Sequence, residues 1–208
     1  MDKKKDRAGT IMIIIGVVLI AACIGLFVWN LLDAERARED MDERLNLVIR
    51  AIEERLKNPG ESSDPGESST SVSADQKNMP VVKLDGYEYI GYLTVPSVEL
   101  RIPVMNTCDD RSLRVAGGRY YGSLETDDLV IAAHNYKNGA GKLDSVKLGD
   151  EVIFTNMNGK EYHYKVGELE IVQPEQVHEM VESRWELSIY TCTYLGTERF
   201  TVRCEMIQ

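Results

Sequence analysis

The sequence predicts a mostly β domain, a small and mainly antiparallel barrel or sandwich with a few short helices, behind an N-terminal membrane helix. Residues 81–208 consist of short runs rich in β-branched and aromatic residues, separated by turn residues. Residues 10–32 contain no charged residue. Residues 58–80 are rich in Ser, Pro, Gly and acid. The 208 residues therefore divide into one ordinary domain and its attachments.

The membrane anchor is the run TIMIIIGVVLIAACIGLFVWNLL, residues 10–32. As a helix it is long enough to cross a hydrocarbon core of about 30 Å. Basic residues crowd residues 1–9, and acidic sequence follows the run, so the positive-inside rule predicts a cytoplasmic N-terminus and an extracellular domain. A cleaved secretory signal has a shorter apolar core, of about 7–15 residues. A lipidated Cys23 is disfavoured because the apolar run continues beyond it.

Two segments connect the anchor to the domain. Residues 33–57 are predicted to form a helical stalk, because apolar residues recur there at spacings of three and four. These residues are Met41, Leu45, Ile49, Ile52 and Leu56. The stripe could pack on its own domain, on a second copy of the chain or on the membrane surface. Residues 58–80 have too few apolar residues to offset the entropy of ordering, which predicts a flexible linker.

Within the domain, the turn Asn158-Gly159 lies between two alternating runs and predicts a tight β-hairpin. Short helices are expected near residues 109–116, 141–146 and 175–183. Strands are expected over most of the remaining domain.

Charge and cysteine content exclude several classes of function. The net charge of −10 argues against a nucleic-acid-binding protein, because no basic stripe is present. The four cysteines are too few and too scattered for a disulfide scaffold, although one bridge between Cys108 and Cys204 is considered. Glu125, Asp127 and Asp128 are interpreted as a solvated acidic loop and not as a calcium site, so no cofactor is expected.

His134 and Cys192 are the candidates for nucleophilic catalysis. Each comes at the end of an apolar, strand-like run, and loop sequence follows His134. Rigid scaffolds place catalytic groups at such positions. His163 lies within a predicted strand, where a surface or cross-strand role is the default, and His178 is predicted to lie on the outer face of a short helix.

Two arginines follow Cys192 in the chain. A thiolate needs positive charge nearby, and an acyl-transfer intermediate needs donors for its oxyanion. Arg199 opens the next predicted strand and would fold back beside Cys192 in a hairpin. Arg203 lies on the same face by strand alternation and is predicted to be an exposed surface charge.

These motifs together resemble the sortase family, the membrane-anchored cysteine transpeptidases of Gram-positive bacteria. The resemblance covers residues 87–205. It rests on Thr191-Cys192 at the end of a strand, Arg199-Phe200 at the start of the next and Ala133-His134-Asn135 at the end of an earlier one. The segments IGYLTVP (90–96), IPV (102–104) and LGDEV (148–152) are also similar to the family.

The resemblance implies an eight-stranded β-barrel as the catalytic domain at 81–208. It also implies that Cys192 is the nucleophile, that His134 is its acid/base partner and that Arg199 holds the substrate and the oxyanion. Thr191 is similar to a threonine that assists near the oxyanion. The implied reaction cleaves an LPxTG-like sorting signal of a secreted protein and forms a thioacyl enzyme. An amine of a peptidoglycan precursor or of a pilin-like surface protein then resolves that intermediate.

Some features depart from the family pattern. Ala133 replaces a glycine, no Asp-Pro-aromatic lid precedes the barrel, no second apolar span follows it, and the connection from Val172 to Leu187 is short. The sortase class therefore stays open. Two other functions also stay open: a thiol hydrolase of cell-wall peptides, and a non-catalytic surface module with a self-associating stalk and a disulfide-paired Cys192.

Overall fold

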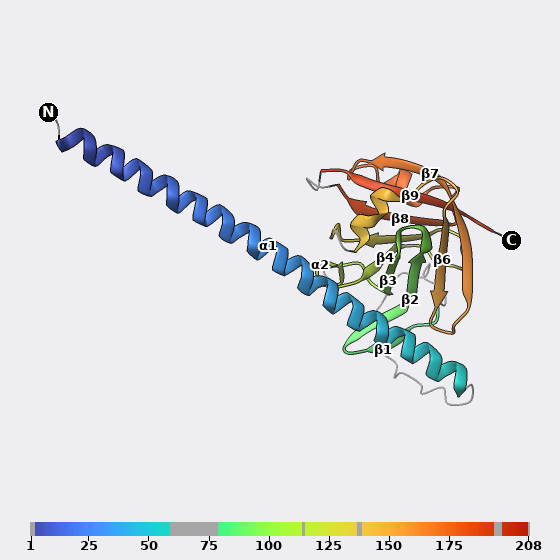
Figure 1. Cartoon of the computed structure of the whole chain (residues 1–208). Helices are drawn as coiled ribbons and strands as arrows, with labels where there is room; N and C mark the ends of the chain where they lie inside the picture. The colour runs from blue at the N-terminus through green and yellow to red at the C-terminus, as the bar shows by residue number, and fades with distance from the viewer. Residues whose placement is uncertain (1–2, 59–78, 114, 137–138, 194–196, 208) are drawn as a thin grey trace. The chain divides into compact units, whose positions relative to one another are not determined.

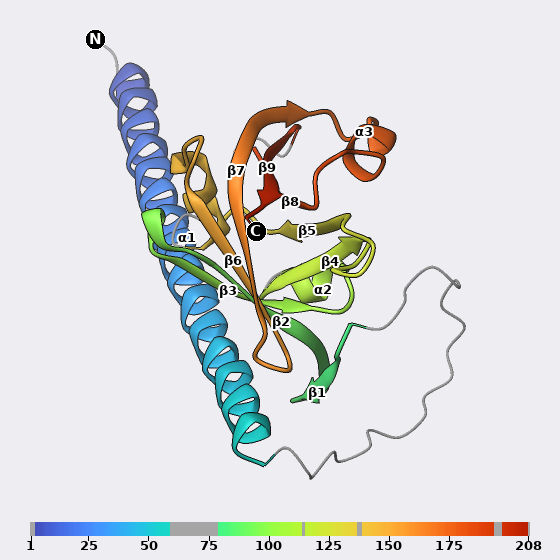
Figure 2. The same cartoon turned by 90° about the vertical axis from the view of Figure 1, so that its right-hand side faces the viewer.

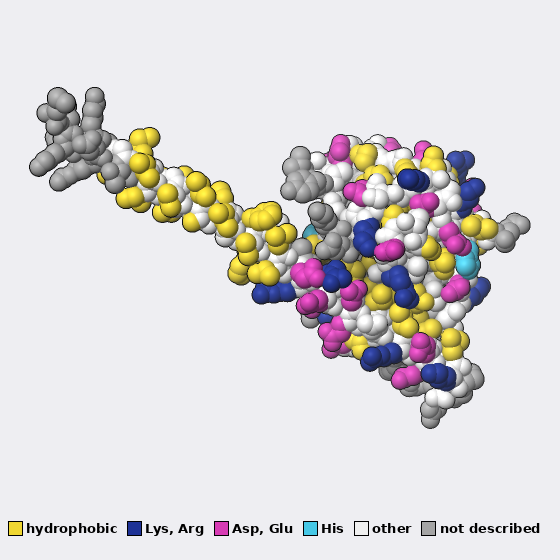
Figure 3. Space-filling model, viewed as in Figure 1, with side chains coloured by type: hydrophobic (Ala, Val, Ile, Leu, Met, Phe, Trp, Pro, Cys, Tyr) yellow, Lys and Arg dark blue, Asp and Glu magenta, His cyan; other side chains and the backbone are white. Residues whose placement is uncertain are grey.

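The computed structural model describes residues 3–58, 79–113, 115–136, 139–193 and 197–207. The chain divides into two compact units, Met1–Arg36 and Ala37–Gln208. The first unit contains a candidate membrane span, Ile11–Leu32, of 22 residues with a mean hydropathy of 3.2. Its side chains are almost entirely hydrophobic (Figure 3). By length and composition, this helix fits the anchor predicted at 10–32.

In the described residues, nine strands and four short helices follow the long helix α1 (Lys3–Lys57) (Figure 1). The strands are β1 (Val82–Leu84), β2 (Tyr87–Val95), β3 (Leu100–Met105), β4 (Gly117–Tyr121), β5 (Leu129–Ala133), β6 (Glu151–Asn156), β7 (Glu161–Val172), β8 (Leu187–Cys192) and β9 (Arg199–Met206). The short helices are η1 (Pro96–Val98), α2 (Asp110–Leu113), η2 (Ala140–Ser145) and α3 (Val177–Val181).

Strands β2 to β9 form a closed barrel of eight strands, which confirms the predicted fold (Figure 2). Their order is β2-β3-β4-β5-β8-β9-β7-β6, and β6 closes the barrel by pairing with β2. β1 pairs with β2 ahead of the segment that binds β6. The pairings β3–β4 and β5–β8 are parallel and the others described are antiparallel, as the sequence predicted for the domain as a whole.

The barrel interior is the main hydrophobic core. Alternate residues of the strands point inward, so Ile131, Ile189 and Val202, on the adjacent strands β5, β8 and β9, are fully buried together. A second cluster lies on the opposite face of β5 and β8 and includes Val130, Tyr190 and Met180 of α3. Both faces of this part of the wall are therefore covered, unlike a sheet with one solvated face.

The stalk packs on its own domain. Met41 belongs to the core cluster of the barrel interior. Val48 and Ile52 pack with Tyr89 and Met105 in a further cluster. Arg44 also donates a hydrogen bond from Nη1 to the Tyr89 hydroxyl oxygen at 3.2 Å. The sequence left open whether the apolar stripe packs on its own domain, on a second copy or on the membrane surface. In the structure it packs on its own domain, against the barrel. The predicted linker falls almost wholly outside the described residues.

The predicted local elements are present. The hairpin between β6 and β7 turns at Gly159. The φ of Gly159 is +76°, which lies in the left-handed region that favours glycine. The Asn156 side-chain oxygen accepts hydrogen bonds from the backbone N–H groups of Asn158 and Lys160, both at 3.0 Å. α2, η2 and α3 lie within or overlap the three segments predicted to be helical.

The bridge considered between Cys108 and Cys204 is absent. Cys204 is buried in the barrel interior, whereas Cys108 packs with the cluster on the outer side of β5 and β8. The strand wall separates the two sulfurs. Burial also raises the pKa of the Cys204 thiol far above its ordinary value, so this residue is an inert core thiol.

Candidate active site

Three adjacent strands, β5, β8 and β9, bring the predicted site residues to one end of the barrel. β5 and β8 are parallel, and Ala133 pairs with Thr191. His134 and Cys192 each directly follow one member of that pair. β8 and β9 are antiparallel, and Cys192 pairs with Arg199. Paired residues on antiparallel strands have Cα atoms only about 4.5–5.5 Å apart.

The Cys192 and Arg199 side chains also share a face. Leu187 and Ile189 of β8 point into the barrel, so the alternation of the strand directs Ser188, Tyr190 and Cys192 outward. Arg199 pairs with Cys192 and lies on the same face. The Cys192 side chain is exposed and forms no disulfide.

Arg199 is held by two aromatic rings. Its guanidinium carbon lies 5.0 Å from the centroid of the Tyr190 ring and 5.6 Å from that of Tyr120. The two rings pack edge to face, with centroids 5.4 Å apart. Such contacts attract a cation electrostatically and orient it without neutralising its charge. The guanidinium is thus positioned and still available to bind an anion.

Burial raises the pKa of the Tyr190 hydroxyl well above its ordinary value, and nearby Cys108 raises it further, while Arg199 opposes the shift. Tyr190 therefore stays neutral at physiological pH. The site keeps the positive charge of Arg199 without a phenolate to cancel it.

His134 begins a tightly folded loop. Its ring packs against Tyr136, with centroids 4.6 Å apart. The Tyr136 carbonyl oxygen accepts hydrogen bonds from the backbone N–H groups of Gly139 and Gly141 at 2.8 and 3.0 Å. A Cβ on Gly139 would lie 2.8 Å from Met41 Cε of α1. The docked part of α1 therefore supports the loop that carries His134.

Two polar atoms near Cys192 lack hydrogen-bond partners among the described residues. They are Thr191 Oγ1 and Arg199 Nη1, and both are buried. Thr191 is only 3% exposed. Buried polar groups normally find partners, so the orphaned Arg199 Nη1, on the face of the candidate nucleophile, is typical of a site that awaits a ligand.

Residues 93–207 match the family model described as the sortase domain. The chain belongs to the sortase family. This match covers β3 to β9 and includes all the site residues described above.

Individual sortases show how far the likeness extends. Sortase A of Bacillus anthracis is 26% identical over 133 residues, which are 60% of this chain and 62% of that protein. Sortase A of Streptococcus agalactiae serotype III (strain NEM316) is 26% identical over 157 residues, 67% of this chain and 58% of that protein. The matches thus span about three fifths of these relatives.

The crystal structure of sortase C from Clostridium perfringens SM101 shares the fold, with a TM-score of 0.51 and 20% identity. It covers 84% of this chain, and the match spans 95% of that chain. Similarity to proteins named sortase A and sortase C leaves the class of this sortase open. Family membership supports a transpeptidase role in general.

The other two histidines bind carboxylates near them in the sequence. His163 Nδ1 lies 2.9 Å from Glu151 Oε1 on the β6–β7 hairpin, and this hydrogen bond raises the pKa of His163. His178 Nδ1 lies 3.1 Å from Glu182 Oε1. Both lie on the surface, as predicted.

The acidic loop makes internal contacts. The Asp128 carboxylate accepts hydrogen bonds from the Ser123 backbone N–H and from the Thr126 hydroxyl. No group of three or more His, Cys, Asp or Glu side chains that could hold a metal occurs in the part of the chain that the structure describes. The expectation of no cofactor stays a prediction.

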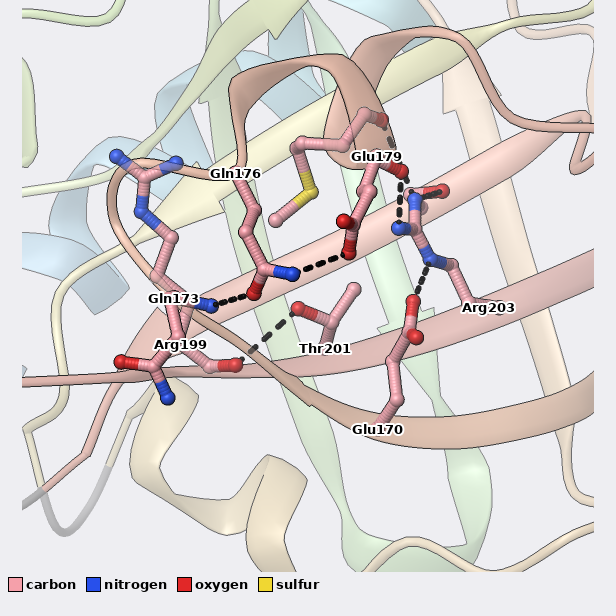
Figure 4. Close-up of polar contacts among 9 residues, drawn as sticks. Glu170, Gln173, Gln176, Glu179, Arg199, Thr201 and Arg203 are labelled. Atoms are coloured by element: carbon pink, nitrogen blue, oxygen red, sulfur yellow. Dashed lines mark hydrogen bonds and ion pairs between the residues drawn. The ribbon is translucent and has the colours of Figure 1, made fainter.

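The prediction that Arg203 is an exposed charge is wrong. It is 1% exposed and forms an ion pair, with Nε 2.6 Å from Glu170 Oε1 (Figure 4). Alternation correctly placed Arg203 on the face of Arg199. The connection between β7 and β8, including α3, covers that face, and nothing in the local sequence of β9 shows this.

Proposed function

We propose that this sortase is a cysteine transpeptidase that cleaves an LPxTG-like sorting signal of secreted proteins and joins the released carboxyl end to an amine. The observation that carries the proposal is the strand register. Cys192 of β8 pairs with Arg199 of β9. His134 and Cys192 directly follow Ala133 and Thr191, which pair between β5 and β8. Nucleophile, acid/base and oxyanion donor are the three roles that acyl transfer requires.

In the first step, the Cys192 sulfur attacks the carbonyl carbon of the threonine in the signal. The C–N bond to the next residue breaks, and protonated His134 gives its proton to the departing amine. A thioester on Cys192 remains. Arg199 donates hydrogen bonds to the oxyanion of the tetrahedral intermediate, a role that its buried and unpartnered Nη1 supports. Thr191, the residue before the nucleophile, is a second candidate near the oxyanion, as the family resemblance implies.

In the second step, an amine enters, passes a proton to His134 and attacks the thioester carbon. A new amide bond forms and the Cys192 sulfur leaves. The amine belongs to a peptidoglycan precursor or to another surface protein, as the family resemblance implies. Water in place of the amine would make the protein a hydrolase.

The test is a hydroxylamine assay on the full chain in detergent micelles. A panel of sorting peptides with hydroxylamine should yield a peptide hydroxamate. Cys192→Ala should abolish the product, and His134→Ala and Arg199→Lys should each reduce kcat/KM by at least about 100-fold. The matched controls are Cys108→Ala, His163→Ala and Arg101→Lys, which should stay near the unmodified enzyme.

Two results would contradict this function. One is the absence of product across a broad panel from a folded enzyme. The other is peptide hydrolysis at a rate and product ratio that added amines do not change, which is the behaviour of a thiol hydrolase. The non-catalytic alternative requires a paired Cys192, whereas the thiol is exposed and forms no disulfide.

We also propose a single-pass protein of the cell membrane with a cytoplasmic N-terminus and an extracellular catalytic domain. The charge-free run at 10–32 and the basic residues before it support this orientation. In a Cys108→Ala, Cys192→Ala background, Ser63→Cys should react with a membrane-impermeant maleimide on intact cells and Lys4→Cys should not. The opposite labelling pattern would overturn the orientation.

A further inference from the structure

Arg203 is a buried charge that the proposed chemistry does not use. It lies on the outer face of β9, on the same side as Arg199 and Thr201 (Figure 4). Burying a guanidinium is unfavourable unless its donors are satisfied, so the partners of Arg203 indicate what it holds.

Four hydrogen bonds connect Arg203 to three other elements. Nε donates to Glu170 Oε1 of β7 at 2.6 Å, and Nη1 donates to Ser188 Oγ of β8 at 2.9 Å. Nη1 also donates to the Met180 carbonyl oxygen at 3.2 Å, and Nη2 to the Glu179 carbonyl oxygen at 2.7 Å. The last two bonds end on the backbone of α3. One side chain therefore fastens α3 to the outside of the barrel wall.

α3 needs such a fastening because it has only five residues. A helix this short is unstable alone, and the carbonyl groups of its last turn have no partners within the helix. The His178 carbonyl is satisfied by the Glu182 backbone N–H. Arg203 supplies donors to the next two carbonyls, and its positive charge suits a helix C-terminus.

The connection that contains α3, residues 173–186, borders the candidate active site. Met180 is fully buried and shares a cluster with Tyr190, whose ring supports the Arg199 guanidinium. Gln173 Nε2 donates to Glu198 Oε1 at 3.2 Å, directly before Arg199 in the chain.

Two further hydrogen bonds, which we call the relay, connect Gln173 to α3. The Gln173 backbone N–H donates to Gln176 Oε1 at 2.8 Å, and Gln176 Nε2 donates to Glu179 Oε2 at 2.7 Å (Figure 4). The relay reaches the residue whose carbonyl Arg203 holds. Residues 173–179 are thus fixed at both ends: Gln173 is bonded to Glu198 next to the site, and Glu179 is bonded to Arg203.

We propose that Arg203 is a positioning residue that fixes residues 173–186 as a preformed wall beside Cys192 and Arg199, against which the peptide substrate binds. The wall then does not have to be ordered when the peptide arrives, and this lowers the free-energy cost of binding. The inference rests on the proposed function in that the substrate is a peptide. It predicts that losing Arg203 raises KM more than it lowers kcat.

The test uses the full chain in micelles with Trp29→Phe, which leaves Trp185 as the single remaining tryptophan. Trp185 lies in the connection and is 9% exposed. Arg203→Met should red-shift its emission and increase quenching by acrylamide, because the connection detaches. KM for an active peptide should rise about fivefold or more while kcat changes less than about twofold. Alkylation of Cys192 by iodoacetamide, followed by mass spectrometry, should be unchanged.

Three further variants sharpen the result. Arg203→Lys keeps the charge but not the planar fork of donors, so its KM and quenching should be intermediate, and it carries the test if Arg203→Met does not fold. Glu170→Gln removes the charged partner and leaves the α3 carbonyl bonds, so it should stay near the unmodified enzyme. Arg101→Met, which removes an exposed arginine on β3, is the matched control.

Unchanged Trp185 emission and quenching in Arg203→Met would overturn the inference, because the connection would then be held without Arg203. A detached connection with an unchanged KM would also overturn it, because residues 173–186 would then be no wall for the peptide. So would an effect of Glu170→Gln as large as that of Arg203→Met. If no peptide is turned over at all, the proposed function fails, and the Trp185 measurement still tests whether Arg203 holds the connection.

Discussion

At the scale of single residues, Arg199 is positioned by aromatic rings. No carboxylate forms an ion pair with it in the described residues, whereas Arg203 on the same strand has Glu170. A carboxylate partner would compete with an oxyanion for the guanidinium. Rings restrict the side chain without occupying its donors.

The Tyr190 ring should therefore matter more than its hydroxyl. Tyr190→Phe keeps the ring under Arg199 and should retain kcat/KM within about twofold. Tyr190→Leu removes one ring of the support and should lower kcat/KM roughly 5- to 30-fold, in line with about 1–2 kcal/mol for a partly desolvated cation–π contact. The hydroxylamine assay measures both.

Tyr162→Leu is the control for the loss of a tyrosine ring. Tyr162 lies on the β6–β7 hairpin, where its ring contacts a different cation, the Lys160 ammonium group. It should leave kcat/KM unchanged. Equal losses in Tyr190→Phe and Tyr190→Leu would assign the effect to the hydroxyl instead.

Residues with local signals were the ones that the sequence could identify. His134 follows the end of β5, Cys192 ends β8 and Arg199 begins β9, and strand termini are readable from the alternation of apolar residues. Burial of Arg203 was not readable, because it depends on α3, which lies about 20 residues earlier in the chain.

At the scale of elements, the docked part of α1 belongs to the same compact unit as the barrel. Met41, Leu45, Val48 and Ile52 are buried, and each buried side chain of this size contributes about 1.5–3 kcal/mol as an upper estimate. The compact unit accordingly runs from Ala37 to Gln208. The helix also contacts the His134 loop at Gly139. Removing it should affect both stability and activity.

Val48→Asp should destabilise the domain by at least about 3 kcal/mol, because it places an unpaired charge at a fully buried position. The free energy of unfolding in urea, measured on the full chain in micelles, gives the value. Asn46→Asp adds the same charge on the exposed face of the helix and should change stability by less than about 0.5 kcal/mol.

A fragment of residues 37–208 should likewise melt at a higher temperature than one of residues 81–208. Equal melting temperatures, together with a tolerated Val48→Asp, would show that the helix does not stabilise the barrel.

The periodicity of the stalk predicted a helix with an apolar stripe but not its partner. A stripe at helical spacing fits any apolar surface of matching shape. The buried residues of the helix also differ slightly from the predicted stripe: Val48, outside the stripe, is buried, and Leu56, within it, is 61% exposed. The hairpin was predictable because its turn residues act within a few positions.

At the scale of the whole molecule, the fold depends on closing the barrel between β2 and β6. Gly91 lies at this seam and pairs with Val104 of β3 and Asn156 of β6. Its φ is +149°, and a Cβ there would lie 2.0 Å from the Thr155 carbonyl oxygen. Only glycine lets β6 approach this closely.

Gly91→Ala should therefore destabilise the barrel by more than about 3 kcal/mol, through backbone strain and the steric clash together. Gly149→Ala is the matched control: its φ is +90°, and the added Cβ would meet nothing closer than Lys165 Cε at 3.8 Å. It should lose only about 1–2 kcal/mol from strain. Chemical denaturation measures both, and similar losses would show that the seam tolerates a side chain.

Periodicity, charge and turn chemistry act over a few neighbouring positions, so the candidate membrane span, the stalk helix, the strand-rich domain and the residues at its strand termini were predictable from the sequence. Three other features depend on the tertiary structure. They are the parallel pairing of β5 with β8, which brings the ends that carry His134 and Cys192 together, the docking of α1 on the barrel and the burial of Arg203 under α3. Each depends on contacts between segments far apart in the chain, whose free energy no local pattern records.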